Sequence, residues 1–380
     1  MVKRSNHSVT ALVLTACLAV LVSACERPSP APNGNGSVTV GERMSATPDP
    51  GFARAYRPRA FSFPADHGPH PEFATEWWYF TGNLQAENGS RFGYQLTLFR
   101  VGLAPGQPAK DSSWRSRQLL MGHLAVSDID NRQHHRAERF SRAAAGLAGA
   151  TASPLQVWLG PWRISGAADS EQAFPLRLSA ADTGFGIDLE LSRGNKPIVL
   201  QGDRGLSQKG AEAGNASYYY SMPRLPTRGR VTIGDTTLSV DGNSWFDREW
   251  SSSALAPDQA GWDWFALQLD DGRDLMFYQM RGKDGRPQRF SKGVLIAADG
   301  HVTPLAHDEV ELSVQDDWEG ADGTRYPLRW RLSVPGHGLD LDVDAAFDDQ
   351  LMDLTVQYWE GAVVVDGSNS GVGYLELSGY

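Results

Sequence analysis

The stretch WWYFTGNLQAENGSRFGYQLTLFR (residues 77–100) decides the fold that the sequence predicts. Apolar and polar residues alternate on both sides of Asn88-Gly89, as they do in half-buried β-strands. Because Asn-Gly tolerates positive φ angles, we expect strands at 77–84 and 92–100 joined by a type I′ turn. The stretch therefore predicts a β-hairpin.

The same pattern continues along the chain, with almost no helical periodicity. Residues 262–265 and 278–280 weakly repeat residues 77–80 and 94–96, as an aromatic strand followed by a strand carrying Tyr-Gln or its equivalent. Asp-Gly pairs, most of them between strand-like runs, begin at positions 241, 271, 284, 299, 322 and 366. We predict an all-β fold of two tandem antiparallel β-barrels, residues 61–250 and 251–380. A barrel of about eight strands can hold one small ligand.

Composition narrows the class of protein. A chain of 380 residues is long enough for two domains. Its 45 acidic and 35 basic residues give a net charge of -10, which argues against a nucleic-acid surface. Two cysteines exclude a disulfide scaffold and a cysteine-rich zinc module.

The N-terminus reads as a targeting segment. Lys3 and Arg4 precede an apolar run at 11–22, and residues 22–25 (VSAC) resemble a bacterial lipobox. We predict a signal peptide at 1–24, a lipid on Cys25 and a flexible tether at 25–60, with Cys25 as a free thiol after an ordinary signal as the alternative. Glu26 favours attachment at the periplasmic face of the outer membrane.

Known cofactor and nucleophile motifs are absent from the sequence. It has no HExxH helix, Walker loop, GxGxxG or nucleophile elbow. His67 and His70 lie in a Pro/Gly turn and are more typical of structural residues than of metal ligands. The acidic residues at 340–353 alternate at first with apolar ones, as on a solvated strand, with calcium as the alternative. We predict no metal and no cofactor.

Three segments place aromatic residues beside carboxylates: 76–79, 247–250 together with 262–264, and 358–360 with Glu376 and Tyr380 near the C-terminus. In a strand, Asp247 and Glu249 point to one face, while Arg248 and Trp250 point to the other. Paired carboxylates raise one another's pKa and so keep one acid protonated near neutral pH. The candidate acids are Asp247, Glu249 and Glu76.

This combination suits protonation of an isolated C=C bond. A desolvated acid protonates one carbon, aromatic faces stabilise the cation, and water captures it without a cofactor. The alternative is structural, with tryptophans sealing the barrel ends and Asp247, Arg248 and Glu249 forming ion pairs. The candidate ligand-binding residues are Trp77, Trp78, Tyr79, Trp250, Trp262, Trp264, Tyr358, Trp359 and Glu360.

These segments also carry a family resemblance. Residues 66–79, 92–96, 244–250 and 358–377 resemble, in order, the signatures of the AttH-like/carotenoid 1,2-hydratase (hydroxyneurosporene synthase) family. The resemblance spans about 60–380 and implies two tandem lipocalin-like (calycin) barrels. It also implies either a hydratase of acyclic carotenoids or a secreted lipoprotein whose gene neighbours an ABC-type exporter.

Three functions follow as expectations. The first is a lipoprotein that binds a hydrophobic small molecule or lipid inside or between its two barrels and serves an ABC-type transporter. The second is a cofactor-free hydratase or isomerase acting on a polyene or other lipid. The third is a structural accessory subunit of the transport complex. The lipobox argues against a literal carotenoid hydratase, because it places the chain outside the cytoplasm.

Overall fold

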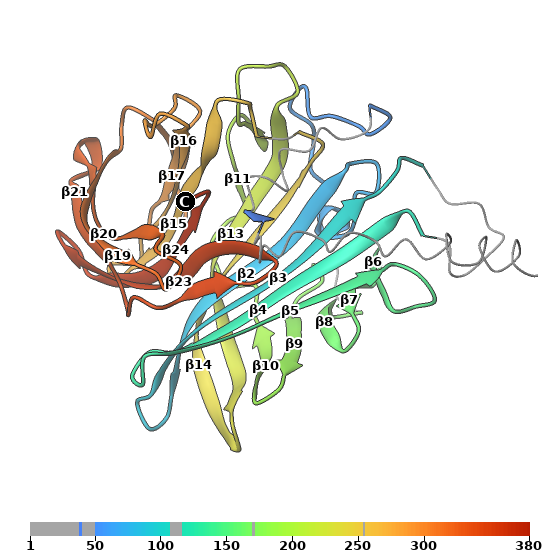
Figure 1. The fold of residues 1–380 in the computed structure, drawn as a ribbon, viewed down its shortest axis with the longest axis horizontal. Coiled ribbons are helices and arrows are strands. Elements are labelled where there is room, and N and C mark those ends of the chain that lie inside the picture. Colours follow the sequence, from blue (N-terminus) through green and yellow to red (C-terminus); the bar gives the residue numbers. More distant parts are fainter. Residues whose placement is uncertain (1–37, 40–49, 107–115, 169–171, 254) are drawn as a thin grey trace, which may run out of the picture. The chain divides into compact units, whose positions relative to one another are not determined.

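The structure is a computed structural model that describes residues 38–39, 50–106, 116–168, 172–253 and 255–380. The signal segment, Cys25 and most of the expected tether lie outside these residues. Apart from two short 3₁₀ helices, the regular secondary structure of the described residues is all β-strand (Figure 1), which confirms the all-β prediction. Among them, no helix is both long and apolar enough to cross a membrane.

The first sheet has thirteen strands, all paired antiparallel. Along its main path the order is β5-β4-β3-β2-β14-β13-β10-β9-β8-β7-β6, and β7 contacts β3, β4 and β5 because the sheet curls on itself. Its strands are β2 (Thr75–Ala86), β3 (Arg91–Gly102), β4 (Gln118–Asp128), β5 (Gln133–Arg142), β6 (Ala148–Ala152), β7 (Leu155–Leu159), β8 (Trp162–Gly166), β9 (Leu176–Asp182), β10 (Phe185–Leu191), β11 (Val199–Leu200), β12 (Leu206–Gln208), β13 (Ala216–Ile233) and β14 (Thr236–Ser251).

The second sheet has eleven strands in the order β18-β17-β16-β15-β24-β23-β21-β20-β19, with β22 and β1 beside β23. Only β1 pairs in parallel. The strands are β1 (Val38–Thr39), β15 (Gln259–Leu269), β16 (Asp274–Gly282), β17 (Lys292–Ile296), β18 (Val302–Ala306), β19 (Glu311–Glu319), β20 (Arg325–Val334), β21 (Leu339–Ala345), β22 (Leu351–Asp353), β23 (Val356–Gly367) and β24 (Gly371–Ser378). The chain changes sheet between Ser251 and Gln259, next to the expected boundary at 250.

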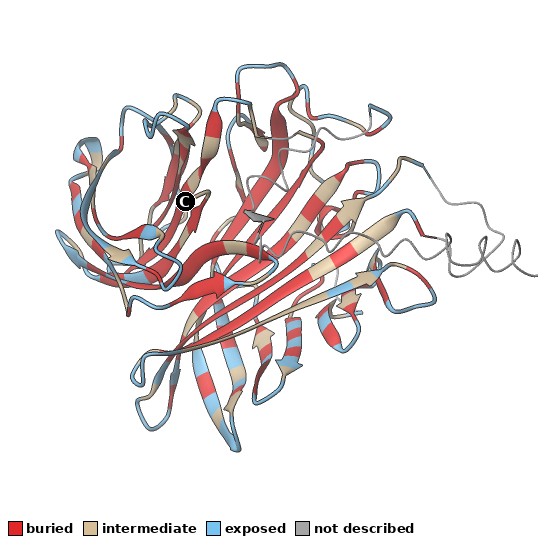
Figure 2. Cartoon of the chain, in the orientation of Figure 1, coloured by how far each residue is buried: buried red, intermediate tan, exposed pale blue. Residues whose placement is uncertain are grey.

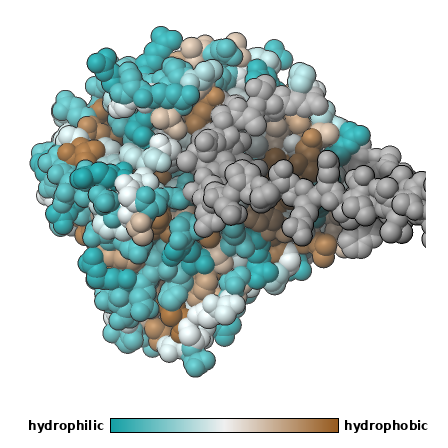
Figure 3. All heavy atoms as spheres, in the orientation of Figure 1, coloured by the Kyte–Doolittle hydropathy of each residue, from teal (hydrophilic) through white to brown (hydrophobic). Residues whose placement is uncertain are grey.

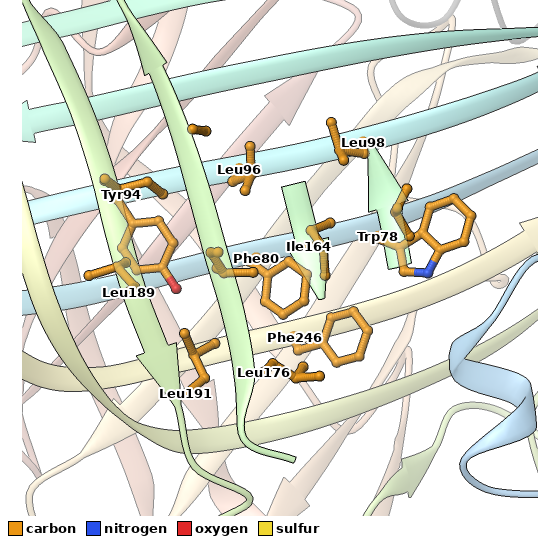
Figure 4. Close-up of a cluster of buried hydrophobic side chains, with 14 of the residues drawn as sticks. Trp78, Phe80, Tyr94, Leu96, Leu98, Ile164, Leu176, Leu189, Leu191 and Phe246 are labelled. Atoms are coloured by element: carbon orange, nitrogen blue, oxygen red, sulfur yellow. The ribbon is translucent and has the colours of Figure 1, made fainter. Parts of the chain in front are cut away.

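Each sheet forms a barrel or half-barrel, as in a two-barrel lipocalin-like fold. Alternate side chains of each strand fill the inside, and buried residues run along both sheets in Figure 2. In the first barrel the core includes Trp78, Phe80 and Phe246, which Figure 4 shows packed with surrounding leucines. Trp359 belongs to the core of the second barrel. The described surface in the view of Figure 3 is mainly hydrophilic.

The hairpin that opens the fold differs from its prediction in one detail. Gln85 pairs with Arg91, so β2 and β3 form the expected hairpin around Asn88-Gly89. Gly89 has a φ of 88°, but Asn88 is not among the residues with positive φ, so the type I′ turn is wrong. The Ala86 N–H bonds the Ser90 carbonyl at 2.8 Å, which makes the loop three residues long and needs only one left-handed residue.

One Asp-Gly pair is also not a turn. Asp241 and Gly242 lie inside β14, and the preceding turn uses Gly234, whose φ is 56°. A Cβ at Gly242 would lie 2.2 Å from the Asn83 carbonyl oxygen of the neighbouring strand. Glycine is needed here for the close approach of two strands, which the sequence pattern cannot distinguish from a turn.

A buried ion network occupies the interior of the first barrel. Glu76 binds Arg100 through one carboxylate oxygen and Arg248 through the other, and the His70 N–H bonds both oxygens at 3.1 and 2.9 Å. Burial favours the neutral acid, but Arg248, His70 and Arg100 outweigh it and hold the pKa of Glu76 well below its usual range. Glu76 is therefore an anion that joins β2, β3 and β14.

The network continues into the segment before β2. Asp66 accepts hydrogen bonds from Arg59 at 2.9 Å and His70 at 3.0 Å. Phe52 and Ala55 are buried, so ordered packing begins within the segment expected to be a tether up to residue 60. The expected tether is ordered near its end because this otherwise Pro/Gly-rich stretch also contains apolar side chains and one paired arginine.

Replacing Glu76 should destabilise the fold strongly. In Glu76→Gln, Arg100 and Arg248 stay buried without an anion, so we expect a loss of about 3–5 kcal/mol in the free energy of unfolding, measured by denaturant titration. The matched control is Asp130→Asn, which breaks the exposed pair with Arg91 and should cost less than about 1 kcal/mol. Equal losses in the two variants would contradict this role for Glu76.

Candidate functional site

The two sheets contact each other through the faces that point away from their cores. β2 contacts β24, and β3 contacts β23. Two hydrogen bonds cross between the sheets: one joins His123 Nδ1 and the Tyr358 hydroxyl at 2.7 Å, and in the other the Ser127 hydroxyl donates to Gln350 at 2.8 Å. We call the buried hydrophobic group at this contact the interface cluster. It contains Tyr79, Val199, Tyr219, Trp245, Trp264, Ala266, Met276, Tyr278, Met280, Val294, Ile296, Ala362 and Tyr374.

The pleat of β14 directs two carboxylates toward this cluster. Asp247 and Glu249 lie on the interface side, whereas Arg248 and Trp250 point into the first barrel, as the alternation predicted. Asp247 is 3% exposed and pairs directly with Tyr79 of β2. The sequence therefore placed these four side chains on the correct faces.

Asp247 is held by two donors from its own sheet. The Tyr219 hydroxyl donates to one carboxylate oxygen, and Trp245 Nε1 donates to the other at 2.7 Å. Burial raises the pKa of Asp247 to about 7, although Ser221, Tyr219 and Trp245 favour the ionised form. Asp247 is thus poised between its two protonation states near neutral pH.

Glu360 and Glu376 form a second acidic pair on the other sheet. They lie directly opposite each other on β23 and β24, and residues in this position have Cβ atoms about 5 Å apart. Trp262 Nε1 donates to Glu376 at 3.1 Å. Burial, with further contributions from Asp247 and Glu249, raises the pKa of Glu376 to about 7 against the opposing effect of Trp262.

Glu360 has the least support for a negative charge. Neither carboxylate oxygen has a hydrogen-bond partner among the described residues. Burial and the neighbouring Glu376 raise the pKa of Glu360 well above its usual range, while Tyr79 and Tyr358 lie near enough to oppose this but outside hydrogen-bond geometry. The pair therefore keeps at least one proton at neutral pH.

Tyr79 connects the two acidic groups. Burial and the carboxyls of Glu360, Glu376 and Asp247 all raise the pKa of its hydroxyl, which has no hydrogen-bond partner in the described part of the chain. Its ring meets Trp264 edge-on at 5.2 Å between centroids. We call Asp247, Glu360, Glu376 and Tyr79 the acid cluster.

Lysine residues border the acid cluster on one side. Lys209 Nζ lies 3.3 Å from Glu249 and 4.0 Å from the centre of the Tyr278 ring. Burial opposes its charge, but Glu249 and Tyr278 raise the pKa of Lys209. Burial and the charge of Lys209 lower the pKa of Lys292 to about 8. The Lys209–Glu249 ion pair therefore lies beside the carboxyls of the acid cluster, which favour the neutral form.

The structure divides the expected site residues into two groups. On or beside the interface lie Asp247, Glu249, Trp77, Tyr79, Trp262, Trp264, Tyr358 and Glu360. Inside the barrels lie Glu76, Trp78, Trp250 and Trp359. Neighbours such as Trp77 and Trp78 separate because successive strand residues point to opposite faces.

Four residues of the site were not among the candidates: Glu376, Lys209, Tyr219 and Tyr278. Glu376 follows the third aromatic segment, and its pairing with Glu360 was readable only if β23 and β24 were assumed to be in register. Lys209 follows β12, in a stretch without strand periodicity, and carries no sequence signal. Pairing across sheets is not encoded locally.

A double-barrelled all-β fold with a buried carboxyl and aromatic site between its sheets defines a tandem lipocalin-like protein. The chain belongs to the AttH-like family, whose model matches residues 54–380. A crystal structure of a protein described as AttH from Nitrosomonas europaea is similar, with 33% identity and a TM-score of 0.77, over 87% of this chain and 100% of that one.

Two more distant structures share the fold. Kievitone hydratase from Nectria haematococca has 16% identity and a TM-score of 0.64, over 86% of this chain and 95% of its own. CghA with Sch210972 has 14% identity and a TM-score of 0.51, over 90% and 97%. Comparison with curated proteins gave no match.

The acid cluster makes stability depend on pH. Asp247 and Glu376 have folded-state pKa values of about 7, above the values near 4 of the unfolded chain, so folding takes up protons between these limits. Their contribution is fully present below about pH 4 and is lost as the pH rises through 7. We measure the free energy of unfolding in urea. As the pH rises from 5 to 8, this free energy should rise by about 2 kcal/mol relative to wild type in Asp247→Asn, and likewise in Glu376→Gln.

Comparison with wild type at each pH cancels the titration of all other groups. The exposed control Asp130→Asn should show no such gain over the same range. A constant difference between wild type and both buried variants would show that these carboxyls ionise normally in the folded protein.

Proposed function

We propose that this protein is a cofactor-free acid–base catalyst that adds water to a C=C bond of a hydrophobic substrate between its two sheets. The observation that carries the proposal is the acid cluster, where three buried carboxyls with raised pKa values surround one tyrosine. Structural ion pairs do not need this arrangement, because an acid that stays protonated stabilises no partner cation. The acid cluster, with its protonated carboxyls, instead suits a site that must deliver a proton.

The Glu360–Glu376 pair is the proton donor in this proposal. Glu360 has no hydrogen bond that stabilises its anion, so its proton is available to an alkene carbon. The Tyr79 side chain lies near Glu360 and its ring meets Trp264, and in this proposal the two aromatic rings stabilise the resulting cation. Glu76, which we expected as a third candidate acid, is held as an anion by two arginines and has no part in this step.

Asp247 is the matching base. Its two hydrogen bonds support the carboxylate, and its pKa of about 7 allows it to accept a proton at neutral pH. Glu360 gives its proton to carbon, a water oxygen bonds to the cation, and the proton released from that water passes to Asp247. Tyr79, close to both acidic groups, is placed to return the proton to Glu360. If Asp247 instead removes a proton from the neighbouring carbon, the product is an isomer.

Two lines support this assignment over a passive carrier. The Glu360–Glu376 pair keeps a proton without any partner cation in the described structure, an arrangement that passive binding does not need. Kievitone hydratase, which shares the fold, is a hydratase by its name. The lipid anchor on Cys25, the periplasmic location and the ABC-type transporter partner concern residues or molecules outside the described structure and stay predictions from the sequence.

The acid and the base should both be essential for turnover. With a panel of acyclic polyenes in D2O and H2¹⁸O, we expect one deuterium on one carbon and one ¹⁸O on the adjacent carbon of the product. Glu360→Gln and Asp247→Asn should each lower kcat/KM by about 10²- to 10⁴-fold, because each removes one proton-transfer step. Mass spectrometry of the product provides both measurements.

The exposed variant Asp130→Asn serves as the control and should keep full activity. Circular dichroism of each variant separates lost chemistry from lost folding. Full turnover in folded Glu360→Gln and Asp247→Asn would rule out the acid cluster as the catalytic group.

The rate should depend on pH with a maximum. The value of kcat/KM should rise through about pH 7 as Asp247 ionises, and fall at higher pH as the Glu360–Glu376 pair loses its last proton. Initial rates from pH 5 to 10 test this. A rate that falls steadily from pH 5 would contradict the role of Asp247 as the base.

A further inference from the structure

A cavity of about 610 Å³ lies outside the acid cluster. Its lining comes from residues 193–198 after β10, from the segments that precede β2 and β9, and from Asp299 and Gly300 in the loop between β17 and β18. None of the acid-cluster residues lines it. Its volume falls within the range of about 300–1,000 Å³ that is usual for small-molecule sites.

Among the described residues, Arg193 gives this cavity a positive charge that no carboxylate balances. Its Nη1 donates to the Lys196 carbonyl at 2.7 Å, which fixes the guanidinium against the backbone. In the described part of the chain it forms no ion pair, and burial lowers its pKa without an opposing carboxylate. Asp299, the one acidic residue in the described part of the lining, is exposed and accepts the His301 N–H at 2.9 Å.

Lys196, the other basic lining residue, is already neutralised. Its ammonium lies 3.3 Å from Asp274 and donates to the carbonyls of Gly272 and Ala297 at 2.6 Å. It holds the segment against the second sheet and has little capacity left for a ligand. The cavity therefore offers one free cation, among the residues that the structure describes.

The remaining lining mixes apolar and polar side chains, the polar ones coming from His67, Gln172 and Asn195. Phe63, Phe174, Pro197 and Ile198 contribute apolar side chains. His67 also lines the cavity, and its Nδ1 is engaged by the Tyr220 hydroxyl at 2.6 Å. Burial, together with the charges of Arg248 and Arg193, lowers the pKa of His67 to about 4, so the ring is neutral at physiological pH.

We propose that this cavity is a second binding site, for a monocarboxylate with an apolar body, in which Arg193 pairs with the carboxylate and Phe63 and Phe174 contact the body. A guanidinium matches a carboxylate with two parallel hydrogen bonds. One free cation suits one negative charge, and a more highly charged phosphate would leave part of its charge unpaired. The site is independent of the proposed catalytic function.

Isothermal titration with decanoate and with decan-1-ol tests the proposal on the full-length protein. Wild type should bind decanoate at least 10-fold more tightly than the alcohol. Arg193→Gln should weaken decanoate binding about 10- to 100-fold, as expected for loss of a charge-assisted hydrogen bond. Arg286→Gln, a highly exposed arginine outside the cavity, is the matched control and should change nothing.

A second variant locates the bound probe. Asn195 lines the cavity and is exposed, so Asn195→Trp should fold normally and obstruct decanoate. Asp247→Asn should leave decanoate binding intact, so failure of the catalytic proposal and failure of this one are distinguishable. Equal affinity for decanoate and decan-1-ol, unchanged binding in Arg193→Gln, or no binding of decanoate at 1 mM would each overturn the proposal.

Discussion

The pleat of β14 is the constraint on which the site depends. Successive residues of a strand point to opposite faces, so Arg248 enters the first barrel while Asp247 and Glu249 face the second sheet. Arg248 is tied to Glu76, the Gly68 carbonyl and the Trp77 carbonyl, which fixes the strand in register with β2. A slip of one residue would exchange the two faces and bury Arg248 among the interface carboxyls.

The protein resolves the cost of burying carboxyls in two different ways. Glu76 keeps its charge because two arginines and a backbone N–H surround it. Glu360 has no cation within ion-pair distance in the described structure and avoids the same desolvation cost by keeping its proton. Two buried glutamates therefore differ in charge: Glu76 is ionised and Glu360 is protonated. Only Glu360 can donate a proton.

The sequence pattern described the local structure well. The alternation around Asn88-Gly89 placed a hairpin correctly, and Trp77 with Tyr79 matches Trp262 with Trp264 in facing the interface. The repeat fails in the following strand: Tyr94 points into the first core, whereas Tyr278 points to the interface. The repeat could be aligned only with a gap, so it did not distinguish registers that differ by one residue. A shift of one residue moves a side chain to the other face of the sheet.

By itself, the sequence determined the strand class, most of the turn positions and which neighbouring side chains of a strand share a face, because these follow from backbone geometry over a few residues. It also contained the signatures of the AttH-like family. Only the tertiary structure decided which carboxyls share a site and which are neutralised by arginine. Asp247 and Glu360 are more than a hundred positions apart, and their protonation depends on desolvation by a second sheet, which no local pattern records.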